Sequence, residues 1–564
     1  MARKRTKKAY QSQFISIMIR SEKDKKEDVF MEEKLIWQAD LLDGRYQNPI
    51  LYTDYSDPDA IRVGEDYFMI TSSFCNAPGL PVLHSKDLVN WNLVNYVLPE
   101  IPTERYDRPV HGCGVWAPSI RYHEGTFYAC FPMPDEGIYM STTKDPFGKW
   151  STPVNIRPGA GWIDPCPFWD DDGKAYLVAG VAKSRIGYKS VLHMVEMQPD
   201  GMGLIGEEVK IFDGNENDQV TIEGPKMYKR NGWYYVFAPA GGVKTGWQTV
   251  LRAKHPFGPY EYKVVMRQGS SPVNGPHQGA WVDTVTGEDW FLHFQDVYGA
   301  GRIVHLQPMR WENDWPVIGA AKEGEDCGEP VLNYRKPNVG NVQVTPCTPP
   351  ASDDFSNGKL GLQWQWNANP KEGWYKIVDG KLQLSAVKTE ASLCYGNVPN
   401  LLLQKWPAPE FTCVTKLQLD GLREGDAAGV ISMGMEYGVL EFVKKEQGIV
   451  LQFIRGTQHY GKILEESTTE EDTMLEILPK ETKNCEVRYE VKVTGTRDLS
   501  ETEKGFPEET VTISYRVDGG DYKKAGEMIS VPGRWVGVKN GVFCVRRDEG
   551  EGGYLTVERV TYQR

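Results

Sequence analysis

Short hydrophobic runs separated by polar turns dominate the chain between residues 45 and 320. The runs are rich in aromatic and β-branched residues and are bounded by Gly, Asp-Gly and Pro, which predicts β-strands rather than helices. Five runs of similar composition recur roughly every 50–60 residues, and a second strand-like run often follows. The five begin at Tyr67, Phe127, Ala175, Trp233 and Asp289. Such a period predicts a repeat architecture.

Five repeats in about 270 residues favour a five-bladed β-propeller over a sandwich for residues 45–320. A proline-bearing segment precedes each of the five runs and would form the first strand of its blade. Because the first strand of every propeller blade lines the central channel, these segments are expected to converge on one axis. They are residues 56–59, 115–119, 163–167, 222–226 and 275–279.

The pattern changes at the proline-rich segment 345–350, which belongs to a predicted linker over 321–350. Beyond it, residues 351–564 contain strands that alternate hydrophobic and polar positions, such as 381–385 and 487–491. Alternation over about 210 residues is typical of a β-sandwich. The predicted fold is therefore all-β, a five-bladed β-propeller followed by a β-sandwich.

Charge and aromatic content narrow the class of ligand. The chain has 64 Lys and Arg against 77 Asp and Glu, which disfavours a nucleic-acid partner, and it has 17 Trp and 28 Tyr. No run of ~18 apolar residues predicts a membrane span. An acidic chain with aromatic-rich strands suits a flat polar ligand such as a sugar.

Residues 1–44 form a lead-in whose first 30 positions are basic. The apolar stretch 14–19 is shorter than the ~7–15 residues of a signal-peptide core, and no small-residue cleavage site follows. We interpret residues 1–30 as a disordered leader, with Met31 as an alternative start. The ten cysteines include no CxxC pair, so without a signal the protein is predicted to be cytoplasmic.

Three of the five converging segments contain a carboxylic acid, namely Asp57, Asp164 and Glu223. Cleavage of a glycosidic bond needs one protonated carboxyl to assist the leaving oxygen and one ionised carboxyl. A third carboxylate nearby would raise the pKa of the acid. One Asp before Pro is commonly only a turn former, but three acids at equivalent repeat positions favour a catalytic site. Asp59 would share the face of Asp57 in a straight strand, yet Pro58 lies between them, so Asp57 is preferred.

These motifs resemble glycoside hydrolase family 43. The resemblance covers roughly residues 45–320 and rests on the segments 48–50, 56–59, 115–118, 164–165 and 223–225. In addition, the segment 361–366 resembles the concanavalin-like (jelly-roll) sandwich that is appended to β-xylosidases and arabinofuranosidases of that family.

The resemblance implies a single-displacement, inverting hydrolase. Asp57 matches the general base, Glu223 the general acid, and Asp164 the residue that tunes and orients that acid. Inversion requires room for a water molecule, so the carboxyls of Asp57 and Glu223 are predicted to lie ~6.5–9.5 Å apart.

Four further residues match the sugar site of the family. His277 matches a histidine near the propeller axis, often beside calcium or water, so a structural calcium with His277 as a ligand is a candidate; no cofactor is required. Arg302 matches an arginine that contacts sugar hydroxyls, and Trp116 and Phe74 match aromatic walls of the pocket. Each residue also has a purely structural alternative. His277 could be a core histidine, Arg302 could form a surface ion pair, and Trp116 and Phe74 could belong to the blade core.

The predicted activity is exo-hydrolysis that releases terminal β-D-xylose, α-L-arabinofuranose or both from hemicellulose-derived xylo- or arabino-oligosaccharides. The sandwich is expected to pack on the propeller and close the pocket, and the alternative is a separable glycan-binding module. A non-catalytic sugar-binding propeller is disfavoured by the presence of all three carboxyls, and an endo-arabinanase by the long sandwich. An oligomer is compatible with the sequence.

Overall fold

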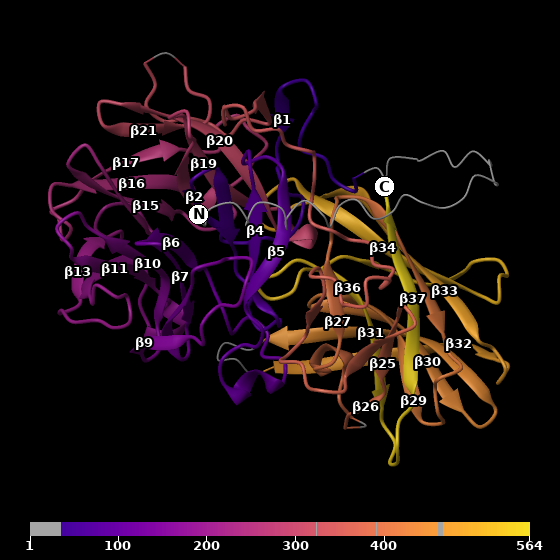
Figure 1. The fold of residues 1–564 in the computed structure, drawn as a ribbon. Helices are drawn as coiled ribbons and strands as arrows, with labels where there is room; N and C mark the ends of the chain where they lie inside the picture. The colour runs from indigo at the N-terminus through magenta and orange to yellow at the C-terminus, as the bar shows by residue number, and fades with distance from the viewer. Residues whose placement is uncertain (1–34, 323, 391, 461–465) are drawn as a thin grey trace, which may run out of the picture. The chain divides into compact units, whose positions relative to one another are not determined.

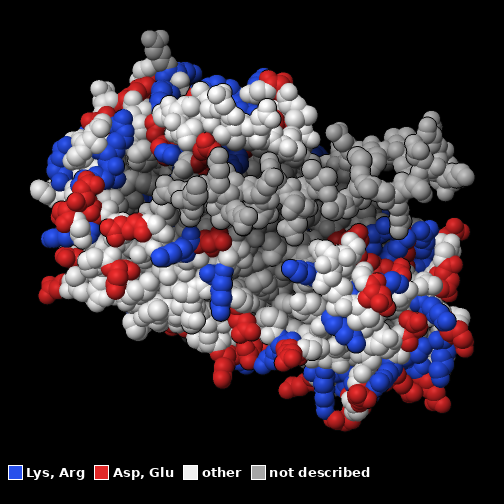
Figure 2. Space-filling view, viewed as in Figure 1, with Lys and Arg blue, Asp and Glu red and all other residues white. Residues whose placement is uncertain are grey.

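The computed structural model describes residues 35–322, 324–390, 392–460 and 466–564 (Figure 1). The basic leader predicted for residues 1–30 lies outside these ranges. Residues 36–564 form one unit whose described secondary structure is almost entirely β-strand, and none of its described helices is long and apolar enough to cross a membrane. On the face shown in Figure 2, acidic and basic side chains are interspersed.

Within the described ranges, residues 59–318 form five antiparallel four-stranded sheets, each made of four consecutive strands. These are the five blades of the predicted propeller, and the runs identified in the sequence are the second strand of each blade. The strands are β2 (Asp59–Val63), β3 (Asp66–Ile70), β4 (Gly79–Ser85) and β5 (Trp91–Leu98) in blade 1; β6 (Ser119–His123), β7 (Thr126–Met133), β8 (Gly137–Thr143) and β9 (Val154–Pro158) in blade 2; β10 (Trp162–Trp169), β11 (Ala175–Val181), β12 (Val191–Met197) and β13 (Val209–Asp213) in blade 3; β14 (Lys226–Arg230), β15 (Trp233–Ala240), β16 (Trp247–Ala253) and β17 (Glu261–Met266) in blade 4; and β18 (His277–Asp283), β19 (Asp289–Asp296), β20 (Arg302–Glu312) and β21 (Trp315–Ile318) in blade 5.

The second strands read as continuous apolar runs because both of their faces are buried between neighbouring blades. Strand β11 is buried at every residue. Leu177 and Ala179 pack in one hydrophobic cluster with blade 2, whereas Tyr176 and Val178 pack in another with blade 4. Burial of both faces removes the polar alternation that a one-sided sheet shows.

The segment after blade 5 returns to the propeller. Strand β22 (Asn333–Arg335) pairs antiparallel with β1 (Arg45–Gln47). The side chain of Asn48 donates hydrogen bonds to the carbonyls of Leu306 and Val331, at 2.7 and 2.8 Å. Part of the predicted linker is therefore held against blade 5 and against the segment of β1 and Asn48.

The described residues after 364 form two large sheets that pack face to face around one hydrophobic core, which confirms the β-sandwich. One sheet has eight strands in the order β23-β27-β36-β29-β30-β31-β32, with β26 on β36, and the other has seven in the order β24-β25-β37-β28-β33-β34-β35. Their bounds are β23 (Gln365–Trp366), β24 (Tyr375–Val378), β25 (Lys381–Ser385), β26 (Val387–Lys388), β27 (Leu402–Lys405), β28 (Phe411–Gln418), β29 (Asp426–Met433), β30 (Glu436–Lys445), β31 (Gly448–Tyr460), β32 (Glu466–Leu478), β33 (Asn484–Arg497), β34 (Phe506–Val517), β35 (Lys523–Ile529), β36 (Lys539–Arg546) and β37 (Tyr554–Gln563); the helical segments are η1 (Glu104–Asp107), α1 (Lys183–Ile186), η2 (Tyr298–Ala300) and η3 (Tyr395–Asn397).

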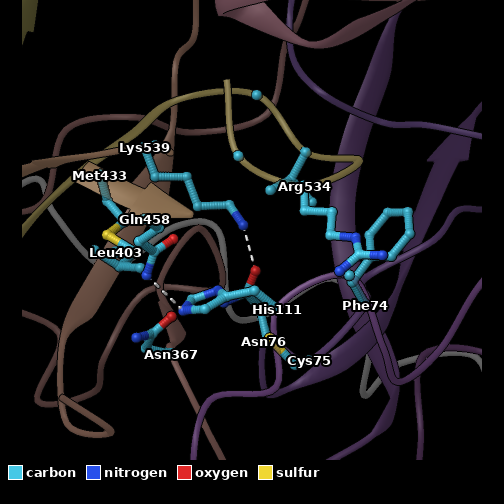
Figure 3. Close-up of a pocket in the computed structure, with 15 residues that line it drawn as sticks. Phe74, Cys75, Asn76, His111, Asn367, Leu403, Met433, Gln458, Arg534 and Lys539 are labelled. Atoms are coloured by element: carbon cyan, nitrogen blue, oxygen red, sulfur yellow. Dashed lines mark hydrogen bonds between the residues drawn. The ribbon is translucent and has the colours of Figure 1, made fainter. Parts of the chain in front are cut away.

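The sandwich packs on the propeller through hydrogen bonds. Ala77 and Trp366 exchange backbone hydrogen bonds at 3.1 and 2.6 Å, like neighbours in a sheet. The side chain of Asn369 accepts from the N–H of Ile101 and donates to its carbonyl. Figure 3 shows two further contacts across this boundary, Lys539 to Asn76 and Gln458 to His111. Trp366 is thus buried at the domain boundary, as expected for an interdomain residue rather than a binding platform.

Candidate active site

The three acidic residues lie at the beginnings of three different blades. Asp57 precedes β2, Asp164 lies in β10, and Glu223 precedes β14. The ladder between β10 and β11 is irregular between Ile163 and Cys166, so Asp164 lies outside regular pairing. Asp57 and Asp164 both have a φ of 55°, a left-handed conformation that non-glycine residues rarely adopt. Such backbone strain is concentrated at functional sites.

The structure brings the three carboxyls into one electrostatic group. Burial, followed by the charge of Asp57, raises the pKa of Asp164. Burial, followed by the charges of Asp164 and Asp57, raises the pKa of Glu223. Asp59, in contrast, accepts hydrogen bonds from the side chain of Arg121 and the backbone of Ile120, so it joins blades 1 and 2.

Asp57 is surrounded by donors. Ser72 Oγ donates to its Oδ2 at 2.5 Å, and Arg302 Nη1 lies 3.2 Å from Oδ1 and 3.4 Å from Oδ2. Asp57 and Arg302 are both buried. A hydroxyl and a guanidinium are partners that stabilise an ionised carboxylate.

Asp164 also accepts hydrogen bonds, one from the backbone N–H of Gly224 at 2.8 Å and one from Gln278 Nε2 at 3.4 Å. The side chain of Glu223 is 24% exposed. Within the described part of the chain, its polar contact is His277, whose Nε2 lies 3.5 Å from Glu223 Oε1. Of the three carboxyl groups, Glu223 therefore has the fewest hydrogen-bond donors to stabilise a negative charge.

His277 is completely buried in the first strand of blade 5 and packs against the ring of Phe294. Burial, followed by the charge of Arg302, lowers the pKa of His277 to about 3, so its ring is neutral. No group of three or more His, Cys, Asp or Glu side chains in the described ranges is arranged to hold a metal ion.

Aromatic side chains surround Arg302. Its guanidinium carbon lies 4.9 Å from the ring centroid of Phe294 and 5.7 Å from that of Trp535. The ring of Trp116 lies 6.3 Å from Phe74 on one side and 6.3 Å from Trp535 on the other. Phe74 is buried, Trp116 is half-buried, and Trp535 is 46% exposed. Of these three rings, Phe74 is therefore the least accessible, and the accessible aromatic surface is that of Trp116 and Trp535.

Trp535 comes from the sandwich, and a hollow of about 300 Å³ opens between its loop and the propeller. The propeller wall includes Lys244, Asp296, Tyr298 and Arg302, and the other wall is formed by residues 531–536. A hollow of this size suits a small ligand. Trp535, Ser72 and Gln278 are not among the site residues predicted from the sequence, and of the three only Gln278 lies in one of the converging segments.

Comparison with known proteins is consistent with this geometry. Residues 46–316 match the model of glycosyl hydrolases family 43, and residues 352–563 match that of the β-xylosidase C-terminal concanavalin A-like domain. The chain is 38% identical to a protein of Xylanibacter ruminicola described as a candidate β-xylosidase, over 91% of this chain and 88% of that one. It is 30% identical to a non-reducing end α-L-arabinofuranosidase of Bacteroides ovatus, over 70% and 75% of the two chains. A bifunctional GH43-CE structure from Bacteroides eggerthii is 26% identical, with a TM-score of 0.75 over 92% of this chain and 63% of that one.

Proposed function

We propose that this chain, which belongs to glycosyl hydrolases family 43 and is a glycosidase, releases single terminal pentose residues, β-D-xylose or α-L-arabinofuranose, from short hemicellulose-derived oligosaccharides. The observation that carries the proposal is the unequal distribution of donors among three interacting carboxyls. The pKa values of Asp164 and Glu223 are both raised, but Asp57 and Asp164 accept hydrogen bonds, whereas Glu223 has a weak contact with His277.

The donors decide which carboxyl keeps a proton. Three neighbouring carboxylates repel one another, so the proton stays on the group whose charge is least compensated. That group is Glu223, which is also the most accessible of the three. Asp57, held by Arg302 and Ser72, is the group that stays ionised.

The proposed reaction is a single displacement. Asp57 takes a proton from water as the water oxygen bonds to the anomeric carbon, and Glu223 gives its proton to the leaving glycosidic oxygen as that bond breaks. Asp164 keeps the proton on Glu223 through its charge and positions the segment through Gly224. Proton exchange with solvent then restores both carboxyls, and the released sugar has the inverted anomeric configuration.

Two observations support action on chain ends and on pentoses. The loop that carries Trp535 covers one side of the site, which leaves room for a terminal sugar rather than an open groove. Two relatives are named as a candidate β-xylosidase and as an α-L-arabinofuranosidase. Both sugars therefore stay in the proposal.

The test is release of nitrophenol from the β-D-xylopyranoside and the α-L-arabinofuranoside, with Asp57→Ala as the blank, because loss of the base affects every leaving group. Activity that vanishes in the variant, with ¹H NMR detecting the inverted anomer first, is expected. Equal rates for the two proteins, or retention of configuration, would overturn the proposal.

Three further expectations stay predictions: a structural calcium near His277, a cytoplasmic location and an oligomer. A chelator that lowers the melting temperature would support the calcium, whereas an unchanged melting temperature and activity would contradict it.

A further inference from the structure

The loop that carries Trp535 lies directly on blade 5. It connects β35 to β36, and Val538 donates its backbone N–H to the carbonyl of Gly299 at 2.8 Å. A Cβ atom on Gly537 would come within 2.7 Å of the carbonyl oxygen of Ala300. A Cβ atom on Gly301 would come within 2.8 Å of Gly537 Cα. The backbone of the loop is therefore in direct contact with the backbone of blade 5. A small shift of the loop moves the blade segment that precedes Arg302.

One buried carboxylate joins the two segments. Asp54, which is 5% exposed, accepts the backbone N–H of Arg302 on Oδ1 at 3.0 Å and the backbone N–H of Gly537 on Oδ2 at 2.9 Å. One oxygen thus serves the propeller and the other serves the sandwich. Asp54 also lies three residues before Asp57 in the same segment.

Two lysines from the sandwich, the half-buried Lys405 and the buried Lys539, lie near Asp54 and oppose its charge. Lys405 Nζ donates to the backbone carbonyl of Asp54 at 2.7 Å. Burial lowers the pKa of Lys405 to about 7, and the charge of Asp54 opposes this shift. Burial likewise lowers the pKa of Lys539, which Asp54 again opposes, while Lys539 donates to Asn76 (Figure 3). A buried carboxylate with this many partners is held in one position.

We propose that Asp54 is a positioning residue for the hydrolysis: it fixes the sandwich loop and Arg302 at one separation, so that Arg302 stays on Asp57 and Trp535 stays over Arg302. The inference rests on the proposed function, because it concerns the rate of that reaction. Its chain of contacts is continuous, from Gly537 through Asp54 to the backbone of Arg302, and from the guanidinium of Arg302 to Asp57.

The substitution Asp54→Asn tests this link. An amide has one acceptor oxygen, so in either orientation its NH₂ group faces one of the two backbone N–H donors. Arg302 or the sandwich loop then shifts, and misplacement near ~1 Å lowers the rate by up to ~10²-fold. We expect kcat for the preferred nitrophenyl pentoside to fall ~10–10²-fold, with a smaller change in KM.

The matched control is Asp353→Asn. Asp353 is also buried and also accepts two backbone N–H groups, from Phe355 and Gly361, besides the indole N–H of Trp364, but all three donors belong to the sandwich and none is Arg302 or the loop of Trp535. We expect this variant to have a lower melting temperature and an unchanged kcat. A kcat for Asp54→Asn within twofold of the wild-type value, with a melting temperature lowered as in the control, would overturn the inference.

Two further variants test the coupling. Asp54→Asn combined with Trp535→Ala should lose less activity than the product of the single losses, because both act through the same loop; independent losses would contradict the proposal. Should Asp54→Asn not fold, Gly537→Ala replaces it, since its Cβ pushes the loop from Ala300 while the carboxylate stays intact, and the same loss of kcat is expected. If the wild-type protein is itself inactive on pentosides, the proposed function fails. That result differs from failure of the inference about Asp54, in which the wild type is active and Asp54→Asn keeps its kcat.

Discussion

Asp164 is hydrogen-bonded to the residue that follows Glu223, because the backbone N–H of Gly224 donates to Asp164 Oδ2 at 2.8 Å. This bond ties the beginning of blade 4 to blade 3 and keeps the two carboxyls close enough to interact. Asp164 therefore acts on the proposed acid in two ways: its hydrogen bond holds the segment of Glu223 in place, and its charge raises the pKa of Glu223. Substitution can separate these two effects.

The substitution Asp164→Asn should move the alkaline limb of the activity profile to lower pH. The charge of Asp164 is one of the causes that raise the pKa of Glu223, so its removal makes Glu223 lose its proton at lower pH. Because the general acid acts in its protonated form, kcat/KM then falls earlier as pH rises, by on the order of one pH unit. The measurement is kcat/KM from pH 4 to 9. An unshifted alkaline limb would show that Asp164 does not tune Glu223.

The substitution Glu223→Gln should affect poor leaving groups most. A general acid contributes ~10²–10⁴-fold when the leaving oxygen needs a proton, and much less when the leaving group is a nitrophenolate. We expect the loss in kcat/KM to grow with the pKa of the leaving phenol across a series of aryl pentosides. Glu207→Gln, at an exposed position, is the control. A loss that is the same for every leaving group is incompatible with an acid role for Glu223.

The propeller was predictable from sequence because its signal is local and repeated. Each second strand is buried on both faces, so it appears as an apolar run, and Asp57, Asp164 and Glu223 stand at equivalent places before three of these runs. Trp535 and Asp54 had no such signal. Trp535 lies in an irregular loop more than 200 residues after the propeller, and the two partners of Asp54 come from distant parts of the chain.

The substitution Arg302→Lys should lower kcat/KM by ~10–10²-fold. The guanidinium of Arg302 contacts Asp57 while it lies against the rings of Phe294 and Trp535, and a lysine ammonium lacks the planar shape for both contacts. Steady-state kinetics on the preferred pentoside measure the loss. Arg310→Lys, on the exposed end of the same strand, is the control and should retain wild-type activity. Equal activity of the two variants would mean that Arg302 is only a structural ion-pair partner.

The stability of the domain boundary should depend on pH through Glu509. This side chain is buried beside Gly299 and Ser530, and burial raises its pKa from 4.5 to about 7, although Ser530 and Arg497 oppose the shift. Because the folded protein binds this proton more tightly than the unfolded chain, the stabilisation is complete below pH ~4.5 and is lost as pH rises through ~7. Glu509→Gln stays neutral, so its melting temperature relative to wild type should rise between pH 5 and pH 8, by about 2–4 °C. Thermal unfolding at both pH values measures this difference, with the exposed Glu481→Gln as the control. A melting-temperature difference between Glu509→Gln and wild type that does not change with pH would show that ionisation of Glu509 does not affect the stability of this boundary.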